Sequence, residues 1–164
     1  MPEDVVKSLG FLCLGSRFKR IGERLQADTQ QIMDQHGISL QAGQYPFLAA
    51  LDRCGSLSIG ELAEAVGITQ PGATRTMGQL VKLGLVVSQS APEDQRRKVV
   101  SLTDKGKELV DFSKRFVWPR IEQAVHDLCG DMAAPILDQL AAIEQGLESL
   151  PLRQRALECP EDRT

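Results

Sequence analysis

Aromatic residues are scarce in this chain of 164 residues, where they make up 4% of the sequence, with one Trp and one Tyr. Aliphatic side chains must therefore dominate the core, and a hydrophobic fraction of 42% is enough to form one. An excess of positive charge is missing too, because the formal net charge is −3. The overall composition therefore gives no sign of a nucleic-acid-binding protein. At this length we expect one compact domain or one interwound pair of small modules.

Cysteine and histidine are also few, with four Cys and two His. No two cysteines have C-x-x-C spacing, and His36 and His126 lie in no metal-ligand pattern, so we predict neither a metal site nor a cofactor. Scattered cysteines suit a reducing compartment. The acidic start MPEDVVK is unlike a signal peptide, and no apolar run is long enough to span a bilayer. We therefore expect a soluble, cytoplasmic protein without a membrane partner.

Motifs that carry common enzyme chemistry are absent as well. The sequence has no GxSxG, no P-loop, no GxGxxG and no HExxH. We therefore predict that the protein is not an enzyme and has no catalytic residues.

Positive charge is nevertheless concentrated in one segment. Residues 69–107 hold seven basic and three acidic side chains, a net charge of +4, whereas residues 1–68 carry −2 and residues 108–164 carry −5. A basic patch on an acidic body is typical of a nucleic-acid-binding surface. From charge alone, a run of solvated surface residues explains the segment about equally well.

Hydrophobic periodicity predicts long helices at both ends of the chain. A stripe with 3-4-3-4 spacing predicts one amphipathic helix over about residues 6–35, which Gly37 ends; its members are Phe11, Leu14, Phe18, Ile21 and Leu25. A second stripe covers residues 136–150. Between them, a helical pattern over residues 103–128 contains Pro119, which predicts a kink or a break. Because a small monomer has little room to cover both stripes, they favour a homodimer; packing on each other is the alternative.

The middle of the chain predicts two short helices joined by a tight turn. Ser58 and Glu61 form a capping box that starts the first helix, and Gly67 turns the chain. Thr69 is suited to cap the second helix, and Pro71 suits its first turn. This pattern is typical of a helix-turn-helix.

Two short strand-like runs follow the second helix. "LVVSQS" and "KVVSLT" flank the turn "APED" and a charged tip, which predicts a β-hairpin, and Thr103 is placed to cap the next helix. A hairpin directly after a helix-turn-helix is the wing of a winged helix. We therefore predict a mainly α fold with a small β-wing.

The segments "LSIGELAEAVGITQPGATRTMGQLVKLGLV" and "PEDQRRKVVSLTDKGKEL" resemble the MarR family of winged helix-turn-helix transcriptional regulators. The second is close to that family's wing signature, represented here by Asp94, Arg96, Leu102, Thr103 and Gly106. The resemblance implies an obligate homodimer that binds double-stranded DNA, with the first and last helices interlocked into a dimerisation domain. It also implies a transcriptional regulator, which we expect to be a repressor on a pseudo-palindromic site and to be released by a small aromatic or other apolar ligand.

These expectations divide the chain into four parts. Residues 1–36 form a dimerisation helix, residues 37–107 form the winged helix-turn-helix, residues 108–151 form linking and dimerisation helices, and residues 152–164 form a frayed tail.

The predicted DNA-binding residues lie on the second helix of the pair and on the wing. Outward positions near the start of a recognition helix meet base edges, so Gln70 is suited to adenine and Arg75 to guanine. Arg96 is suited to a narrow minor groove, and Asp94 is expected to orient it. The full predicted set is Thr69, Gln70, Pro71, Thr74, Arg75, Arg96, Arg97 and Lys98, with Asp94 as the wing-orienting residue.

Trp118 and Tyr45 are the candidates for a ligand pocket, although large aromatics more often belong to a core or an interface. Two alternative functions stay open. Some MarR-family members sense oxidants through an N-terminal cysteine, but Cys13 lies in an apolar run and is expected to be inert, while Cys54 beside Gly55 is expected to be more exposed. A winged helix can also serve protein–protein assembly, which would not need basic residues on both the recognition helix and the wing.

Overall fold

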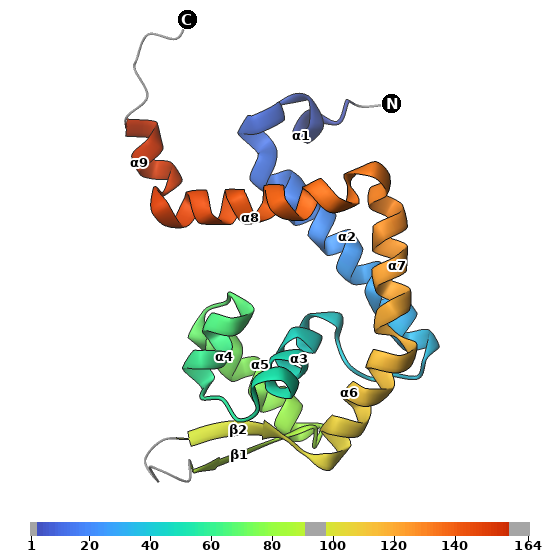
Figure 1. Ribbon diagram of the computed structural model, residues 1–164. Coiled ribbons are helices and arrows are strands. Elements are labelled where there is room, and N and C mark those ends of the chain that lie inside the picture. The colour runs from blue at the N-terminus through green and yellow to red at the C-terminus, as the bar shows by residue number, and fades with distance from the viewer. Residues whose placement is uncertain (1–2, 91–97, 158–164) are drawn as a thin grey trace, which may run out of the picture. The chain divides into compact units, whose positions relative to one another are not determined.

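The computed structural model describes residues 3–90 and 98–157, and its backbone divides into two compact units with a boundary after Ile121, within helix α7. Figure 1 labels the helices and strands. The first unit contains, in chain order, α1 (Val5–Ser8), the 3-10 turn η1 (Gly10–Cys13), α2 (Leu14–Gln35), η2 (Ala42–Gln44), α3 (Tyr45–Cys54), α4 (Ile59–Val66), α5 (Gln70–Lys82), β1 (Val86–Ser90), β2 (Lys98–Leu102), α6 (Asp104–Phe116) and the start of α7 (Trp118–Cys129). The second contains the rest of α7, η3 (Gly130–Met132), α8 (Ala133–Ser149) and α9 (Leu152–Leu157).

The N-terminal helix is shorter than its stripe of apolar residues. The prediction of one helix from about residue 6 was wrong, because α1 ends at Ser8 and α2 begins only at Leu14. Gly10 separates them with a φ of 55°, a left-handed conformation that glycine adopts readily and a helix interior does not allow. Asp4 caps the start of α1 and connects it to α2: its carboxylate accepts from the Lys7 backbone N–H and pairs with Arg20 of α2.

The helix-turn-helix is confirmed by α4 and α5. Ser58 and Glu61 form the predicted capping box, in which the Glu61 side chain accepts the Ser58 backbone N–H at 2.7 Å. Gly67 follows α4 with a φ of 71° and turns the chain into α5. The local signals in the sequence were sufficient here because capping and left-handed glycine turns depend on neighbouring residues alone.

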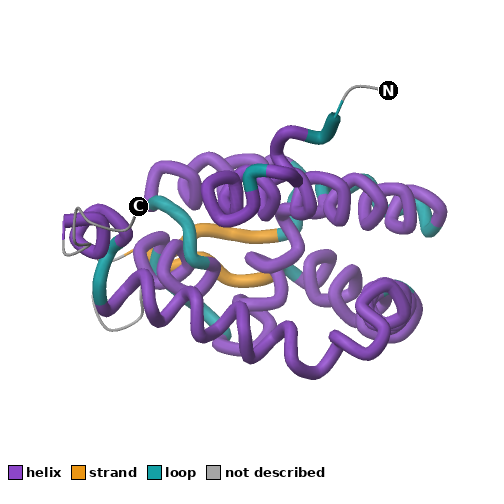
Figure 2. Tube along the Cα trace, turned by 90° about the horizontal axis from the view of Figure 1, so that it is seen from above, coloured by secondary structure: helices purple, strands orange, loops and turns teal. Residues whose placement is uncertain are grey.

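The wing is confirmed as a two-stranded antiparallel sheet, drawn in orange in Figure 2. Its register pairs Val86 with Leu102 and Ser90 with Lys98. The sequence did not predict a further bridge, in which Leu57 and Val100 exchange backbone hydrogen bonds of 3.0 and 2.7 Å. This bridge joins the segment before α4 to the wing.

The core of the first unit is aliphatic, as the scarcity of aromatics predicted. It packs the inward faces of the helices against the wing, and its largest fully buried apolar side chains are Met33, Leu48, Leu62, Leu80, Val100, Val110 and Val117. Val117 lies where α6 stops and α7 begins, and Pro119 occupies the second position of α7, so the predicted break is confirmed.

The second unit consists of helices. Gly130 adopts a φ of 53° between α7 and α8, and Pro151 follows α8. Residues 152–157 were expected to belong to a frayed tail, but they form α9, where the Arg155 guanidinium donates to the Gly146 and Leu150 carbonyl oxygens at 2.6 and 2.8 Å. Within the described ranges, no helix is both long enough and apolar enough to cross a membrane.

Candidate nucleic-acid interface

Helix α5 has two distinct faces, as the sequence predicted. Ala73, Met77 and Leu80 are buried with exposed fractions of 3% or less. The opposite face is exposed along the length of the helix; its residues are Gln70, Pro71, Thr74, Arg75, Gly78 and Lys82. A helix held in this way by its apolar side presents its polar side to a partner.

The start of α5 differs from the capping geometry that we expected. Thr69 occupies the N-cap position, with extended backbone, but its hydroxyl makes no capping hydrogen bond. Pro71 stands at the second helical position, where a cap often binds, and it has no N–H to donate. The Thr69 hydroxyl does not accept from the N–H of Gly72 at the third position either, whereas the Thr74 hydroxyl donates to the Gln70 carbonyl at 3.0 Å.

The positive side chains on this surface are not engaged elsewhere. Within the described part of the chain, the side chains of Arg75 and Lys98 form no hydrogen bond or ion pair, and both residues are exposed. By contrast, Lys107 pairs with Asp104 at 3.3 Å, and Lys105 donates to the Leu83 carbonyl at 2.8 Å. Arg75 and Lys98 thus keep their full charge available to an anionic partner.

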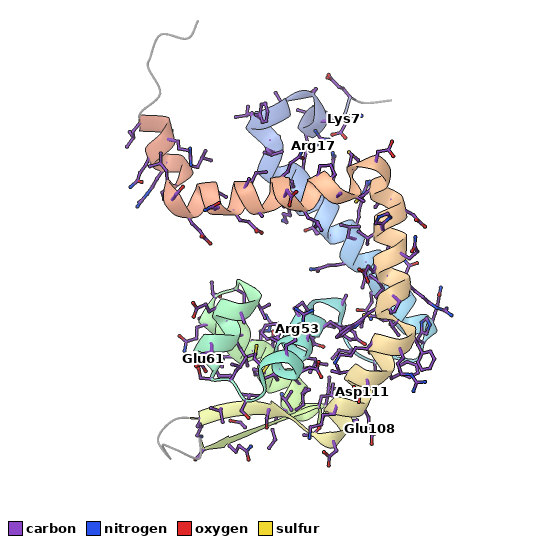
Figure 3. All side chains as sticks on the ribbon, viewed as in Figure 1. Lys7, Arg17, Arg53, Glu61, Glu108 and Asp111 are labelled. Atoms are coloured by element: carbon purple, nitrogen blue, oxygen red, sulfur yellow. The ribbon has the colours of Figure 1, made fainter. Side chains whose placement is uncertain are left out.

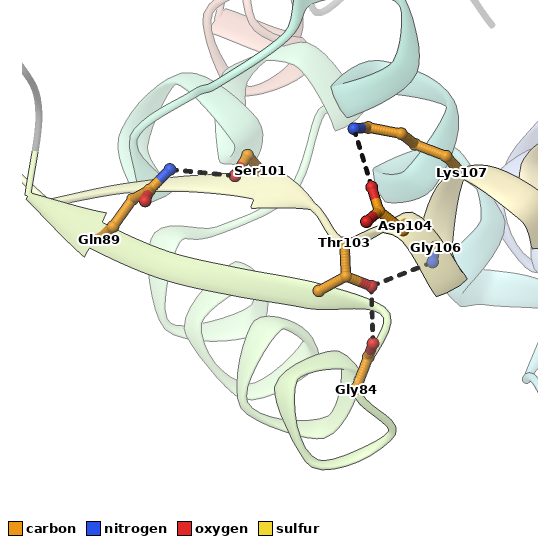
Figure 4. A network of polar contacts seen from close by, with 7 residues as sticks. All are labelled: Gly84, Gln89, Ser101, Thr103, Asp104, Gly106 and Lys107. Carbon is orange, nitrogen blue, oxygen red and sulfur yellow. Dashed lines mark hydrogen bonds and ion pairs between the residues drawn. The ribbon is translucent and has the colours of Figure 1, made fainter.

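The C-terminal end of α5 is clamped by the start of α6 (Figure 4). The Thr103 hydroxyl donates to the Gly84 carbonyl at 2.7 Å and accepts from the Gly106 backbone N–H at 3.0 Å. The Thr103 backbone N–H donates to the Leu85 carbonyl at 3.0 Å. We call Thr103, Lys105 and Gly106, with the carbonyls of residues 83–85 that they face, the Thr103 clamp. The clamp connects the recognition helix to α6, and the sequence showed its residues but not this contact.

The predicted wing-tip residues Asp94, Arg96 and Arg97 lie outside the described residues. Lys98, the fourth predicted wing residue, is exposed at the first position of β2 and pairs with Ser90.

Tyr45 and Trp118 contact each other. Their rings meet edge to face, with 5.9 Å between the centroids. Tyr45 is buried, and its hydroxyl lies 2.7 Å from the Ser113 hydroxyl, which donates in turn to the Leu109 carbonyl. Burial raises the pKa of the Tyr45 phenol above its usual value of 10.0, and the hydrogen bond with Ser113 opposes this only in part.

A cavity of about 470 Å³ lies elsewhere in the first unit, between the end of α2, the start of β1 and α6. Its walls are largely apolar, with Lys105, Glu108 (labelled in Figure 3) and His36 as its ionisable residues. Neither Tyr45 nor Trp118 lines it.

Other chemistry finds little support among the described residues. They contain no group of three His, Cys, Asp or Glu placed to hold a metal ion. Cys13 is half-buried at the end of η1, and Cys54 is exposed at the end of α3, as expected.

Comparison with known proteins leads to the MarR family, which the sequence resembles. The sequence profile of the MarR family matches residues 36–97. The transcriptional repressor CouR, solved bound to a 23-mer DNA duplex, is 30% identical and superimposes with a TM-score of 0.70 over 80% of this chain and 92% of that chain. CouR bound to p-coumaroyl-CoA gives a TM-score of 0.72 at 26% identity, covering 88% of this chain and 97% of that chain.

A third structure extends the likeness to another regulator. NadR in complex with 4-hydroxyphenylacetate is 26% identical, with a TM-score of 0.58 over 87% of this chain and 96% of that chain. The helix-turn-helix, the wing and these matches lead to one conclusion. The chain belongs to the MarR family of winged helix-turn-helix transcriptional regulators, whose members bind DNA and are not enzymes.

Proposed function

We propose that this protein is a homodimeric transcriptional repressor that binds a pseudo-palindromic site in double-stranded DNA. The observation that carries the proposal is the exposed polar face of α5, where the side chains of Thr69 and Arg75 have no hydrogen-bond or ion-pair partner among the described residues. The repressor role is supported by the likeness to CouR, which is itself a transcriptional repressor.

The residues of α5 have separate tasks in this proposal. Arg75 donates two hydrogen bonds to guanine, and Gln70 forms a pair with adenine. Thr74 contacts a base or a phosphate, while the free hydroxyl of Thr69 donates to a phosphate oxygen. Gly78 lets the helix backbone approach the DNA, because nothing lies within 4 Å of the position its Cβ would take.

The wing has a different task, because its tip reads shape. Arg96 enters a narrow minor groove, and Asp94 holds the guanidinium in place. Arg97 and Lys98 contact phosphates. This part rests on the sequence resemblance and on the exposure of Lys98.

Dimerisation is supported by apolar side chains that each unit leaves exposed. In the first unit, α2 exposes Phe18 and Ile21 to 39% and 47%. In the second, α8 exposes Leu137 and Leu147 to 68% and 50%. A second copy of the chain would cover such surfaces, as in isologous dimers. Two-fold symmetry then places the half-sites about 10–10.5 bp apart.

Release by a small aromatic or other apolar ligand completes the proposal. Its support is the presence of p-coumaroyl-CoA and 4-hydroxyphenylacetate on the related regulators. A ligand at Tyr45 and Trp118 would have to separate their rings, whereas the cavity beside Lys105 needs no such movement. No cofactor is required.

The test is selection of bound duplexes from random DNA by the purified protein, followed by affinity measurements on the selected site. Arg75→Ala should cost about 1–3 kcal/mol per half-site and relax the preference at one symmetric base pair. Arg53→Ala removes the same charge from the exposed end of α3 and is the matched control.

Salt provides a second readout in the same assay. A dimer with 6–10 phosphate contacts should lose about 10³–10⁵ in affinity between 50 and 200 mM salt. A protein that selects no duplex, or whose affinity ignores salt, would support a role in protein–protein assembly instead. Loss of binding upon mild oxidation that Cys13→Ser abolishes would identify an oxidant sensor.

A further inference from the structure

Three glutamine side chains connect α2 to the recognition helix within the first unit. Gln30 lies on α2, Gln44 ends η2, and Gln79 lies in the last turn of α5. We call Gln30, Gln44 and Gln79 the glutamine relay.

The first step of the relay fixes the segment that leaves α2. The Gln30 amide nitrogen donates to the Leu40 carbonyl at 3.0 Å, and its amide oxygen accepts the Ala42 backbone N–H at 2.8 Å. The Gln30 side chain therefore holds the segment between α2 and η2 through two backbone groups, the Leu40 carbonyl and the Ala42 N–H. Its amide nitrogen is also 2.9 Å from the Asp34 carboxylate, which fixes the orientation of the amide.

The second step reaches α5. Gln44 is 6% exposed, and its amide oxygen accepts the Gln41 backbone N–H at 3.0 Å. Its amide nitrogen donates to the amide oxygen of Gln79 at 2.8 Å, across 35 residues of sequence. The side chain of Gln41 completes a capping box around η2. The buried amide thus joins the connecting segment to the recognition helix.

A buried amide at this place contributes more to geometry than to stability. Its burial costs free energy that its hydrogen bonds offset, so a leucine of similar size would serve the core about as well. Unlike an apolar contact, however, the Gln44–Gln79 bond is satisfied in only one alignment of the two elements. It therefore defines how far along its axis, and at what rotation, α5 sits.

The position of Gln79 links this alignment to DNA reading. Gln79 is four residues after Arg75, so the two side chains lie on the same side of α5, about 6 Å apart along the axis. A shift of α5 at Gln79 consequently moves Arg75 by a similar amount.

We propose that the glutamine relay is a positioning device that fixes Arg75 relative to α2 and thereby sets the half-site spacing that the dimer accepts. This inference rests on the proposed function, in which α2 contributes to the dimer contact and α5 reads each half-site. One added base pair moves the second half-site by about 3.4 Å along the DNA and about 35° around it. If the connection from α2 to α5 is rigid, the protein loses affinity for a duplex with that displacement. If the connection is loose, the loss of affinity is smaller.

The experiment measures affinity on duplexes whose half-site spacing is the selected one, or is longer or shorter by one and two base pairs. It compares the wild type with Gln44→Leu, Gln79→Leu and the double variant, which leaves neither amide without its partner. Gln123→Leu is the control, because the Gln123 amide bonds only Asp127 of its own helix α7. Thermal unfolding and dimer mass are recorded for every protein.

We expect the ratio of affinities between the selected spacing and a one-base-pair change to fall about 3- to 30-fold in the double variant. Its dimer mass and the control's ratio should not change, and its thermal midpoint should fall only by what the loss of the Gln41–Gln44 capping bond costs. If Gln44→Leu fails to fold, Gln79→Leu at its half-exposed position still tests the ratio.

Two results would overturn the inference. In the first, the variants lose affinity equally on all spacings, so that the wild-type ratio is retained; the relay is then structural, and the proposed function still stands. In the second, the wild type binds no spacing in preference, in which case the proposed dimeric site itself is wrong.

Discussion

Substitution of Gly106 by alanine should destabilise the protein, although the same change in most helices is favourable. Gly106 lies in the first turn of α6, inside the Thr103 clamp. A Cβ added there would lie 2.1 Å from the Leu85 carbonyl oxygen and 3.3 Å from a Leu102 methyl carbon. The obstacle is backbone, so a change of side-chain rotamer cannot relieve the contact.

The backbone of Leu85 has little freedom to withdraw. Its carbonyl accepts the Thr103 N–H, and its own N–H donates to the Leu80 carbonyl, each at 3.0 Å. Relief therefore requires α6 to move away from the end of α5. That movement breaks the Thr103–Gly84, Thr103–Leu85 and Lys105–Leu83 hydrogen bonds of the clamp.

The expected loss of unfolding free energy is about 2–4 kcal/mol. Three hydrogen bonds contribute about 0.5–1.5 kcal/mol each, and the helix propensity of alanine returns at most about 1 kcal/mol. Crowding around the buried Gly106 adds a penalty of about 1–3 kcal/mol where the contact is relieved incompletely. In a chain of this size, the loss should lower the thermal midpoint by about 4–16 °C.

The assay is thermal or urea unfolding at one fixed protein concentration, because dimer stability depends on concentration. Gly78→Ala is the matched control: nothing lies within 4 Å of its added Cβ, so it should stabilise the protein by about 0.5–1 kcal/mol. A Gly106→Ala protein as stable as the Gly78→Ala protein would refute the reasoning.

The sole tyrosine of the chain, Tyr45, should titrate above pH 10 in the folded protein, because burial raises its pKa. Because the pKa of Tyr45 is higher in the folded than in the unfolded protein, its contribution to the free energy of unfolding is complete below pH 10 and falls above it by up to about 1.4 kcal/mol per pH unit. A folded protein whose absorbance titration matches that of the urea-unfolded chain would contradict this. Ser58→Ala removes the capping box of α4 and should cost about 0.5–2 kcal/mol in urea unfolding, whereas no change would mean that the cap is dispensable. Arg96→Ala should weaken binding mainly on duplexes with A·T-rich flanks, and Asp94→Ala should do so in part; a shift in central-base preference instead would disprove the wing assignment.

Local signals in the sequence predicted most of the winged helix. Ser58 and Glu61 meet across one helical turn, and Gly67 turns the chain by itself, so neither depends on distant residues. The hairpin and the break before Pro119 follow from alternation and from the missing N–H of proline. The two faces of α5 follow from its 3.6-residue period.

Two local expectations failed for reasons that are themselves local. The first helix was predicted to continue through Gly10 because its stripe of apolar residues does. Periodicity shows which face of a helix would be apolar, but it does not show whether the backbone stays helical. Thr69 was expected to cap α5, but Pro71 leaves no N–H at the second helical position.

By itself, the sequence determined the fold class, the exposed face of the recognition helix and the family. Only the tertiary structure decided how that helix is held. The Gln44–Gln79 bond joins residues 35 apart, and the Tyr45–Ser113 bond joins residues 68 apart. The need for glycine at position 106 arises from the carbonyl of Leu85. Hydrophobic periodicity records only whether a side chain is inside or outside, whereas a hydrogen bond between distant elements depends on where the packed backbone places both partners.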